Sequence, residues 1–434
     1  MKTNEQNRQG IVFSGLLFSV LAFLIYIILT LLLSKTLIGW IMLGKADEKG
    51  LLSAVRFDGN NPANQYLLGR YYHTDLSNPD IEKAILSYRE SLVLSPVQSS
   101  AWIDLSKAYQ ITGQSIEAEY ALERAVKLSP NNPDLMWEAG TFWLINNMTD
   151  KAVSALRRYI LLMPDKQSQV YDLCWKLKLD NSRILSDLIP QSYEYQSRYL
   201  MYLINTKRTW ETQEVWKLLD KKNLDKKIFI SYINFLINNS LYENAKSVWK
   251  EITEKIEDIG TNDDSSLIWN AGFENEILNG GLDWLISEVE GANVFIDESI
   301  HLIGNRSLGL SFDGKHNPDI TIAQQVVRVD PGTKYTLRSY IKTDSLTTTN
   351  GIILNVQGHN CNGLNKKTDA MTGTTFWREV SLDFETPAGC RAVTVKIRRE
   401  RSGKFDNKIE GTAWIDGISL KQQADLLKSS SRKP

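Results

Sequence analysis

The side chains that most often carry out chemistry are few in this chain and are not arranged for catalysis. Its four histidines, His73, His301, His316 and His359, are scattered without the spacing of metal ligands. The sequence contains no His-Glu-x-x-His motif, no phosphate-binding loop and no Gly-x-Ser-x-Gly elbow. A glycosidase would need two facing carboxylates about 5 to 10 Å apart, and the sequence singles out no such pair. We therefore predict a binding protein without enzymatic activity.

Two of the three cysteines could form a disulfide bond. Cys361 and Cys390 lie near each other in the sequence, whereas Cys174 stands alone. A bond between the first two would close a loop of about 30 residues and contribute about 3 to 4 kcal/mol in the chain-entropy model. It would also favour an oxidising compartment. The alternative is two unpaired buried thiols. Cys174 is expected to be a core residue of the helical part.

Length and charge limit the classes of protein. A chain of 434 residues is too long for one ordinary core, so two or three domains are expected. Its 50 Lys and Arg balance 51 Asp and Glu, which leaves no overall electrostatic footprint for nucleic acid or an anionic membrane surface. We expect no nucleic-acid partner.

The elements that must position any site begin with an apolar segment near the amino terminus. Residues 11–33 carry no charge and, at about 1.5 Å rise per residue, would cover a hydrocarbon core of about 30 Å. A cleaved signal peptide is the alternative, but its apolar region would be shorter, and Ser34-Lys35-Thr36 is not a small-x-small cleavage site. The segment predicts a transmembrane helix with apolar character to about residue 43. It would follow a short cytoplasmic tail at 1–10 and serve as an uncleaved signal anchor.

An internal repeat follows. The pattern Trp102, Leu105, Ser106, Tyr109, Ala118, Leu122, Ala125 and Pro130 returns 34 residues later as Met136, Ala139, Gly140, Trp143, Ala152, Leu156, Tyr159 and Pro164. An upstream unit has the same phase, so clear repeats occupy 62–96, 99–132 and 133–166. This spacing resembles the tetratricopeptide repeat, in which small residues let two helices pack closely and Pro ends the second helix. Diverged hairpins at 167–258 extend the helical solenoid to 46–258.

The first helices of such repeats line a concave groove, and this position predicts a peptide-binding surface. The residues expected to line it are Tyr66, Arg70, His73, Lys107, Gln110 and Trp137. Arg70 and Lys107 would hold an acidic group of a partner protein. The alternative is that these are ordinary solvated residues on a spacer.

A different architecture begins after the polar linker 260–266. About eight short alternating segments, separated by turn clusters such as Asp330-Pro331-Gly332-Thr333, occupy 267–421 and precede a polar tail at 422–434. Regular short strands of this kind predict an antiparallel β-sandwich.

The motifs of this region resemble carbohydrate-binding modules with the jelly-roll, galactose-binding-like fold that are attached to xylanases and other glycanases. The resemblance rests on Asn270-Ala271-Gly272-Phe273-Glu274, on the 324–337 stretch, on Gly373 to Trp377 and on the closing Ile415-Asp416-Gly417-Ile418-Ser419-Leu420. It implies a structural calcium ion held by Glu274 and Asp416, although Gly417 stands where a second acidic residue is usual. Two turn-capping carboxylates are the alternative.

The same resemblance implies a sugar site on a concave face of the sandwich. Polar and aromatic residues that could line such a face are Tyr340, Asn355, Gln357, His359 and Asn360. Trp284, Trp377 and Trp414 belong to the motifs that define the fold, so we expect them to pack in the core.

These features predict three parts: a transmembrane helix, an α-helical tetratricopeptide-type solenoid and a carboxy-terminal antiparallel β-sandwich. The combination resembles bacterial envelope proteins tied to surface-polysaccharide (exopolysaccharide) assembly or export. It implies a non-catalytic adaptor, anchored by a single pass in the bacterial inner membrane with its body in the periplasm or outside. Its solenoid would bind protein and its sandwich glycan. A scaffold with protein contacts only, or an accessory part of a glycan-processing enzyme, are the alternatives.

Overall fold

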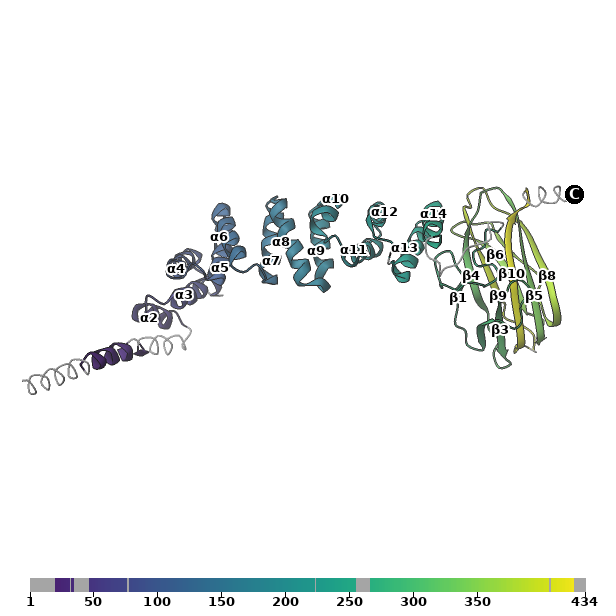
Figure 1. Cartoon of the computed structure of the whole chain (residues 1–434), viewed down its shortest axis with the longest axis horizontal. Coiled ribbons are helices and arrows are strands. Elements are labelled where there is room, and N and C mark those ends of the chain that lie inside the picture. Colours follow the sequence, from purple (N-terminus) through teal and green to yellow (C-terminus); the bar gives the residue numbers. More distant parts are fainter. Residues whose placement is uncertain are drawn as a thin grey trace, which may run out of the picture. The chain divides into compact units, whose positions relative to one another are not determined.

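The computed structural model describes residues 20–31, 33–34, 47–75, 78–222, 224–254, 266–405 and 407–424 (Figure 1). The predicted tail 1–10, most of the linker 260–266 and the end of the tail 422–434 lie outside these residues.

The predicted membrane-spanning helix is not supported. Among the described residues, no helix combines the length and the apolar character that a membrane crossing requires. Residues 11–19, and the extension to about residue 43 beyond residue 34, lie outside the described part. The fold class is therefore corrected to a helical part followed by a β domain, and the inner-membrane localisation is corrected with it.

The chain divides into two compact units, Met1–Pro190 and Gln191–Pro434. The first unit is helical. Its described elements are α2 (Glu48–Phe57), α3 (Pro62–Thr74), α4 (Ile81–Leu94), α5 (Ser99–Ile111), α6 (Ser115–Leu128), α7 (Pro133–Ile145), α8 (Thr149–Leu162), η1 (Pro164–Lys166), α9 (Gln167–Lys176), α10 (Asn181–Arg183) and η2 (Ile184–Leu188).

Small residues let the helices of each pair approach closely. A Cβ atom added at Gly69 of α3 would lie 2.6 Å from the ring of Tyr88 of α4, and one at Gly140 of α7 would lie 2.6 Å from Leu156 of α8. Pro62 and Pro133 stand in the first turns of α3 and α7, where a missing N–H costs nothing. The predicted helical repeats are confirmed by these pairs.

The second unit combines helices with a β domain. Its helices are α11 (Tyr193–Asn205), α12 (Thr209–Leu218), α13 (Lys226–Asn238) and α14 (Tyr242–Thr253). They form two further hairpins, α11 with α12 and α13 with α14. The Trp216 ring of α12 stacks on Tyr232 of α13 at 4.4 Å between centroids, so one hairpin packs on the next through aromatic side chains.

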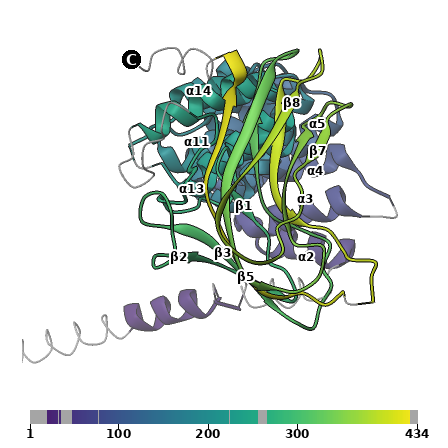
Figure 2. The same cartoon turned by 90° about the vertical axis from the view of Figure 1, so that its right-hand side faces the viewer.

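The β domain is a sandwich of two five-stranded antiparallel sheets. Its strands are β1 (Leu285–Ile286), β2 (Ala292–Asp297), β3 (Ser307–Asp313), β4 (Ile320–Arg328), β5 (Lys334–Leu346), β6 (Ile352–Gly358), β7 (Asn365–Lys367), β8 (Gly373–Glu385), β9 (Ala392–Arg399) and β10 (Glu410–Gln422). One sheet has the order β1-β4-β9-β6-β7 and the other β2-β3-β10-β5-β8. Figure 2 shows the long strands β5 and β8 side by side. The predicted antiparallel sandwich is confirmed.

The core between the sheets contains Trp284, as expected, and also Phe273. Phe273 and Trp284 are fully buried in it, with ring centroids 5.6 Å apart. Trp414 behaves differently. Its neighbours Ala413 and Ile415 belong to this core, so the alternation of β10 turns Trp414 to the opposite face of its sheet. Trp414 is nevertheless 7% exposed, so it is buried as expected, although on the face of its sheet that points away from the layer between the sheets.

Candidate functional site

The face of the β2-β3-β10-β5-β8 sheet that points away from the core carries a row of aromatic side chains. In register across the strands lie Phe295, Gly309, Trp414 and Lys342. Gly309 is required here because the Phe295 ring lies over it, and an added Cβ would be 2.4 Å from that ring. The Lys342 ammonium lies 5.6 Å from the centre of the Trp414 ring. We call this face, with the residues of the next paragraph, the outer face.

Further along β5 and β8, the outer face combines aromatic rings with charged groups. Tyr340 lies opposite Glu379 on β8 and donates its hydroxyl hydrogen to that carboxylate at 3.3 Å. Phe376 of β8 is 91% exposed. It lies where the pairing of β5 with β8 is irregular, between Ile341 and Thr343. A β-bulge of this kind redirects side chains, which explains an exposed phenylalanine on a strand.

Trp414 is held in place from the edge of this face. Its indole N–H donates to Asp297 Oδ2 at 2.8 Å. Asp297 also accepts backbone N–H groups from Ser299 and Ile300, and these bonds together with the indole N–H lower its pKa although partial burial works the other way. The carboxylate therefore stays ionised and fixes the indole orientation. Trp414 itself is only 7% exposed, so it helps to build the outer face from within. The rings of this face that reach solvent are Phe376 and, in part, Phe295 and Tyr340.

Of the five residues predicted to bind sugar, only Tyr340 lies on the outer face. Asn355 and Gln357 are on β6, in the other sheet. Asn355 is 4% exposed, and its side-chain amide donates to Asn365 Oδ1 and to the Lys366 carbonyl of β7. Gln357 accepts from the Lys396 ammonium at 2.6 Å. The amide of Asn355 therefore joins two strands.

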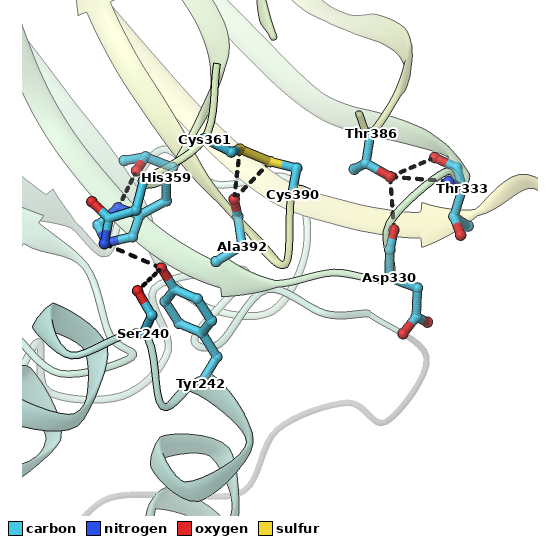
Figure 3. The surroundings of a disulfide bond; sticks show 11 residues. Ser240, Tyr242, Asp330, Thr333, His359, Cys361, Thr386, Cys390 and Ala392 are labelled. Carbon is cyan, nitrogen blue, oxygen red and sulfur yellow. Dashed lines mark hydrogen bonds between the residues drawn. A yellow bond between two sulfur atoms is a disulfide. The ribbon is translucent and has the colours of Figure 1, made fainter. Parts of the chain in front are cut away.

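His359 lies beside Tyr242 of α14 (Figure 3), and the next residue, Asn360, contacts the same helix. The imidazole of His359 packs edge-on against the Tyr242 ring of α14 at 5.9 Å, and the Asn360 amide donates to the Tyr242 hydroxyl at 3.3 Å. Burial lowers the pKa of His359, with the nearby Lys396 charge adding to it. The next residue, Cys361, forms a disulfide with Cys390. This bond ties the contacting turn to the segment that leads into β9.

Other contacts extend this junction between α13, α14 and the β domain. The Trp249 ring of α14 meets Trp269 edge-on at 5.6 Å, and Arg328 of β4 pairs with Glu243 of α14 at 2.6 Å. The Gly281 N–H donates to the Asn234 side chain of α13 at 2.9 Å. The β domain thus covers the end of the second unit's helical hairpins, an end that repeat proteins must otherwise protect with a capping helix.

The predicted calcium ligands act as hydrogen-bond acceptors in this structure. Glu274 and Asp416 receive backbone N–H groups at 2.6 to 3.1 Å, which come from Leu302, Ile303, Asn305, Arg306 and Gly417. Burial raises the pKa of Asp416 and the Glu274 charge adds to this rise, while the N–H groups oppose it.

These hydrogen bonds bear directly on whether calcium fits. The donated N–H groups point at the oxygens that a cation would need, and the described residues contain no cluster of three or more side chains suited to a metal. Glu274 and Asp416 fit the turn-capping role better than calcium binding.

In the first unit, the predicted groove residues lie on α3, α5 and α7 as expected for first helices, but several are already paired. The Tyr66 hydroxyl donates to Asp104 of α5 at 2.9 Å, and the Arg70 guanidinium lies 6.0 Å from the Tyr66 ring. His73 shares a hydrogen bond with the Tyr88 hydroxyl, and burial lowers its pKa. Arg70 is exposed.

The remaining predicted groove residues cluster around α7. Lys107 forms an ion pair with Glu138 at 3.0 Å. Gln110 and Trp137 line a cavity of about 590 Å³ between α5 and α7. The pairing of Lys107 leaves it poorly suited to hold an acidic group together with Arg70. Sequence reasoning missed Glu138. The available signal was its position directly after Trp137, which was itself predicted to line the groove.

Comparisons with known proteins give likenesses of fold over parts of the chain. No protein family model matches the chain, and no curated protein matches it either. A carbohydrate-binding module of family 16 is 23% identical over 36% of this chain and 98% of its own length, with a TM-score of 0.26. The crystal structure of MamA is 19% identical over 42% of this chain and 91% of its own, with a TM-score of 0.27.

A third likeness involves a larger protein. The enzymatically active domain of tailspike protein 4 from bacteriophage CBA120 is 16% identical over 36% of this chain, with a TM-score of 0.27. This chain spans only 21% of that domain's length. These low scores and identities show a likeness of fold alone.

The outer face shows what sequence reasoning missed. Sequence reasoning does not single out Phe295, Lys342 and Phe376, and it predicts the burial of Trp414 without saying on which face of the sheet Trp414 lies. A usable signal existed for Trp414, since a period of two with Ala413 and Ile415 inside places Trp414 outside. The alignment of Phe295 with Trp414 had no signal, because strand neighbours in the sheet come from distant parts of the sequence.

Proposed function

We propose that this protein is a non-catalytic binding protein that holds a polysaccharide on the outer face of its β domain. We also propose that it holds a segment of a partner protein in the groove of its first unit. The observation that carries the first half is the outer face itself, where Phe376 is 91% exposed on a bulge and Tyr340 lies beside Glu379. Trp414, held by Asp297 and 7% exposed, is a nearly buried part of the same face. Aromatic rings cover the apolar faces of sugar rings, and carboxylates and ammonium groups bond to sugar hydroxyls.

The shape of this site favours a chain over a single sugar. The outer face is the side of a five-stranded sheet, and its solvent-accessible aromatic residues come from β2, β5 and β8. A row that crosses several strands can contact successive units of a polymer. The narrower role expected from the sequence, in the assembly or export of surface polysaccharide, stays a prediction.

Affinity electrophoresis of the full chain through gels that contain soluble polysaccharides tests the first half. Suitable polymers are xylan, mixed-linkage β-glucan, β-galactan and a bacterial exopolysaccharide. We expect at least one of them to retard the protein, and Phe376→Ala and Tyr340→Ala to weaken that retardation at least tenfold, about 1.4 kcal/mol.

The matched control is Trp210→Ala. Trp210 lies on α12, outside the β domain, and is 79% exposed, so it removes an exposed aromatic ring without touching the outer face. Its retardation should equal that of the unmodified protein. Absence of retardation in every gel would favour a scaffold that makes protein contacts only, and equal loss in the control would exclude the outer face as the site.

A further inference from the structure

The second sheet of the sandwich, β1-β4-β9-β6-β7, also has a face that points away from the core, and this face is rich in side-chain amides. Val395 and Ile397 of β9 belong to the core, so Lys396 between them points outward. Residues directly opposite each other on neighbouring strands point to the same side. The register therefore gathers on this face Gln324, Asn355, Gln357, Asn365, Lys367, Thr394 and Lys396. We call this surface the amide face.

Lys396 lies at the centre of the amide face. Its register partners are Gln324 on one side and Asn355 on the other, and its ammonium group donates to Gln357 Oε1 at 2.6 Å. This hydrogen bond is open to solvent and uses one of the three N–H groups of the ammonium. Gln357 is exposed, and Lys396 and Gln324 are partly exposed, so a ligand on this face can reach all three side chains.

The charge of Lys396 has no carboxylate partner within the described part of the chain. Other cations on the same side of the sheet are paired: Arg328 with Glu243, Lys367 with Glu400, and Arg398 with Asp319. Burial lowers the pKa of Lys396, and the like charge of Arg398 adds to this lowering. A carboxylate bound beside Lys396 would oppose this repulsion and favour the charged ammonium.

The groups around this charge suit hydroxyl groups better than apolar ones. The amides of Gln324 and Gln357 can both donate and accept hydrogen bonds, and Asn365 keeps its N–H groups free while its oxygen accepts from Asn355. On the described strands, open apolar surface of this face is limited to Leu285 and Val326, towards the β1 edge. A peptide or lipid would therefore find few apolar contacts, whereas sugar hydroxyls can bond to the amides.

We infer that the amide face is a second glycan-binding site of the β domain, one that takes an acidic polysaccharide. A uronic-acid carboxylate accepts from the Lys396 ammonium, and neighbouring hydroxyl groups bond to the amides of Gln324 and Gln357. This site goes beyond the proposed function and is independent of it, because the amide face and the outer face belong to different sheets and point in opposite directions from the core.

The test is affinity electrophoresis of the full chain through gels that contain polygalacturonate or alginate. Each polymer is used in its acidic form and with its carboxylates esterified, so the comparison isolates the charge on one backbone. We expect at least one acidic polymer to retard the protein at least tenfold more strongly than its ester. Lys396→Met, which removes the charge and keeps a long side chain, should reduce this retardation at least fivefold with an unchanged thermal unfolding midpoint. Gln357→Ala should reduce it several-fold.

The matched control is Lys315→Gln, which removes the same charge from an exposed position elsewhere in the β domain and should keep the retardation. Phe376→Ala, on the outer face, should keep it as well. Retardation by neither acidic polymer, equal retardation by acid and ester, or retardation that survives Lys396→Met would overturn this inference and leave the outer face to its own test. Competition by poly(L-glutamate) as strong as that by the acidic polysaccharide would also overturn it, in favour of an acidic protein segment.

Discussion

Asp283 is a carboxyl group in a place that water hardly reaches. It is 1% exposed, its Oδ2 accepts the Leu278 N–H at 2.7 Å, and its Oδ1 has no hydrogen-bond partner in the described residues. Burial raises the pKa of Asp283 to about 6, against the lowering effect of the Leu278 hydrogen bond. The neighbouring Gly281 contacts α13 and α14, so this carboxyl group lies beside the junction between helices and β domain.

The raised pKa of Asp283 predicts a loss of stability as pH rises. Below pH 4 the Asp283 carboxyl group is protonated in both the folded and the unfolded protein. Between pH 4 and 6 it ionises in the unfolded chain but stays protonated in the folded protein. The folded state binds more protons, so the free energy of unfolding falls over this window, by about 3 kcal/mol for a pKa raised to about 6. Asp283→Asn should become more stable relative to the unmodified protein by about this amount between pH 3.5 and 7, measured by urea unfolding. The exposed Asp344→Asn should show no such change.

Glu274 and Asp416 lead to a prediction about calcium. Because backbone N–H groups already bond to both carboxylates, we expect the thermal unfolding midpoint to be the same in calcium and in a chelator. Glu274→Gln should lower stability by about 0.5 to 1.5 kcal/mol, because this exposed carboxylate is a stronger acceptor than an amide for the N–H groups of the turn at 305–306. A midpoint that rises in calcium for the unmodified protein, but not for Glu274→Gln, would restore the calcium site.

At the scale of elements, the hairpin turns of the helices share one backbone conformation. Gly113 between α5 and α6 has φ of 76°, and the corresponding turns of three other hairpins contain Asn147, Lys207 and Ser240 with φ of 58 to 61°. This left-handed region suits glycine and is strained for residues with a Cβ atom. The repeat thus imposes its turn geometry even where the residue type is unfavourable.

This shared turn predicts that Lys207→Gly stabilises the second unit. Relief of the left-handed strain outweighs the added chain entropy of glycine, for a gain of about 0.5 to 1 kcal/mol. The change Lys217→Gly, in the last turn of α12, should instead lower stability, by about 0.5 to 1 kcal/mol. Both values come from urea unfolding followed by circular dichroism. Equal losses for the two variants would show that the turn at Lys207 does not require this conformation.

At the scale of the whole molecule, the second unit joins helical hairpins to a β domain. The side chains that join them serve this junction and are not needed within either part alone. Gly281 has φ of 67°, and an added Cβ would lie 2.4 Å from the Trp249 ring of α14. Tyr242, on the same helix, contacts His359 and Asn360 near the disulfide. The β domain and the hairpin of α13 and α14 therefore form one packed body.

Gly281→Ala should disturb this packing more than backbone strain alone would. Gly332→Ala is the control, because Gly332 has φ of 65° with nothing within 4 Å of the added atom. We expect the control to cost about 1 to 2 kcal/mol and Gly281→Ala to cost about 1 to 3 kcal/mol more. Hydrogen exchange should rise in α14 for Gly281→Ala only. Equal exchange in both variants would mean that the junction tolerates the extra atom.

The sequence predicted the helix pairs better than it predicted the sugar-binding residues, and single residues show why. Helix pairs followed from Gly69, Gly140 and the alanines of each repeat, because a local periodic pattern records which face is packed. The sugar-binding prediction combined Tyr340 with Asn355, yet these residues occupy different sheets. A period of two tells which residues share a face of one strand but leaves open which strands are neighbours.

The sequence by itself determined the local choices: helical hairpins over the repeats, short strands after residue 267, and the absence of familiar catalytic motifs. Only the tertiary structure decided that Trp414 and Phe295 share the outer face. It also decided that His359 and Asn360 contact Tyr242, and that Lys107 forms an ion pair with Glu138. The physical reason is the sequence separation of the residues that interact. Helix and strand periodicity arises from residues a few positions apart, whereas each of these contacts joins residues that lie far apart in the sequence and meet only in the folded chain.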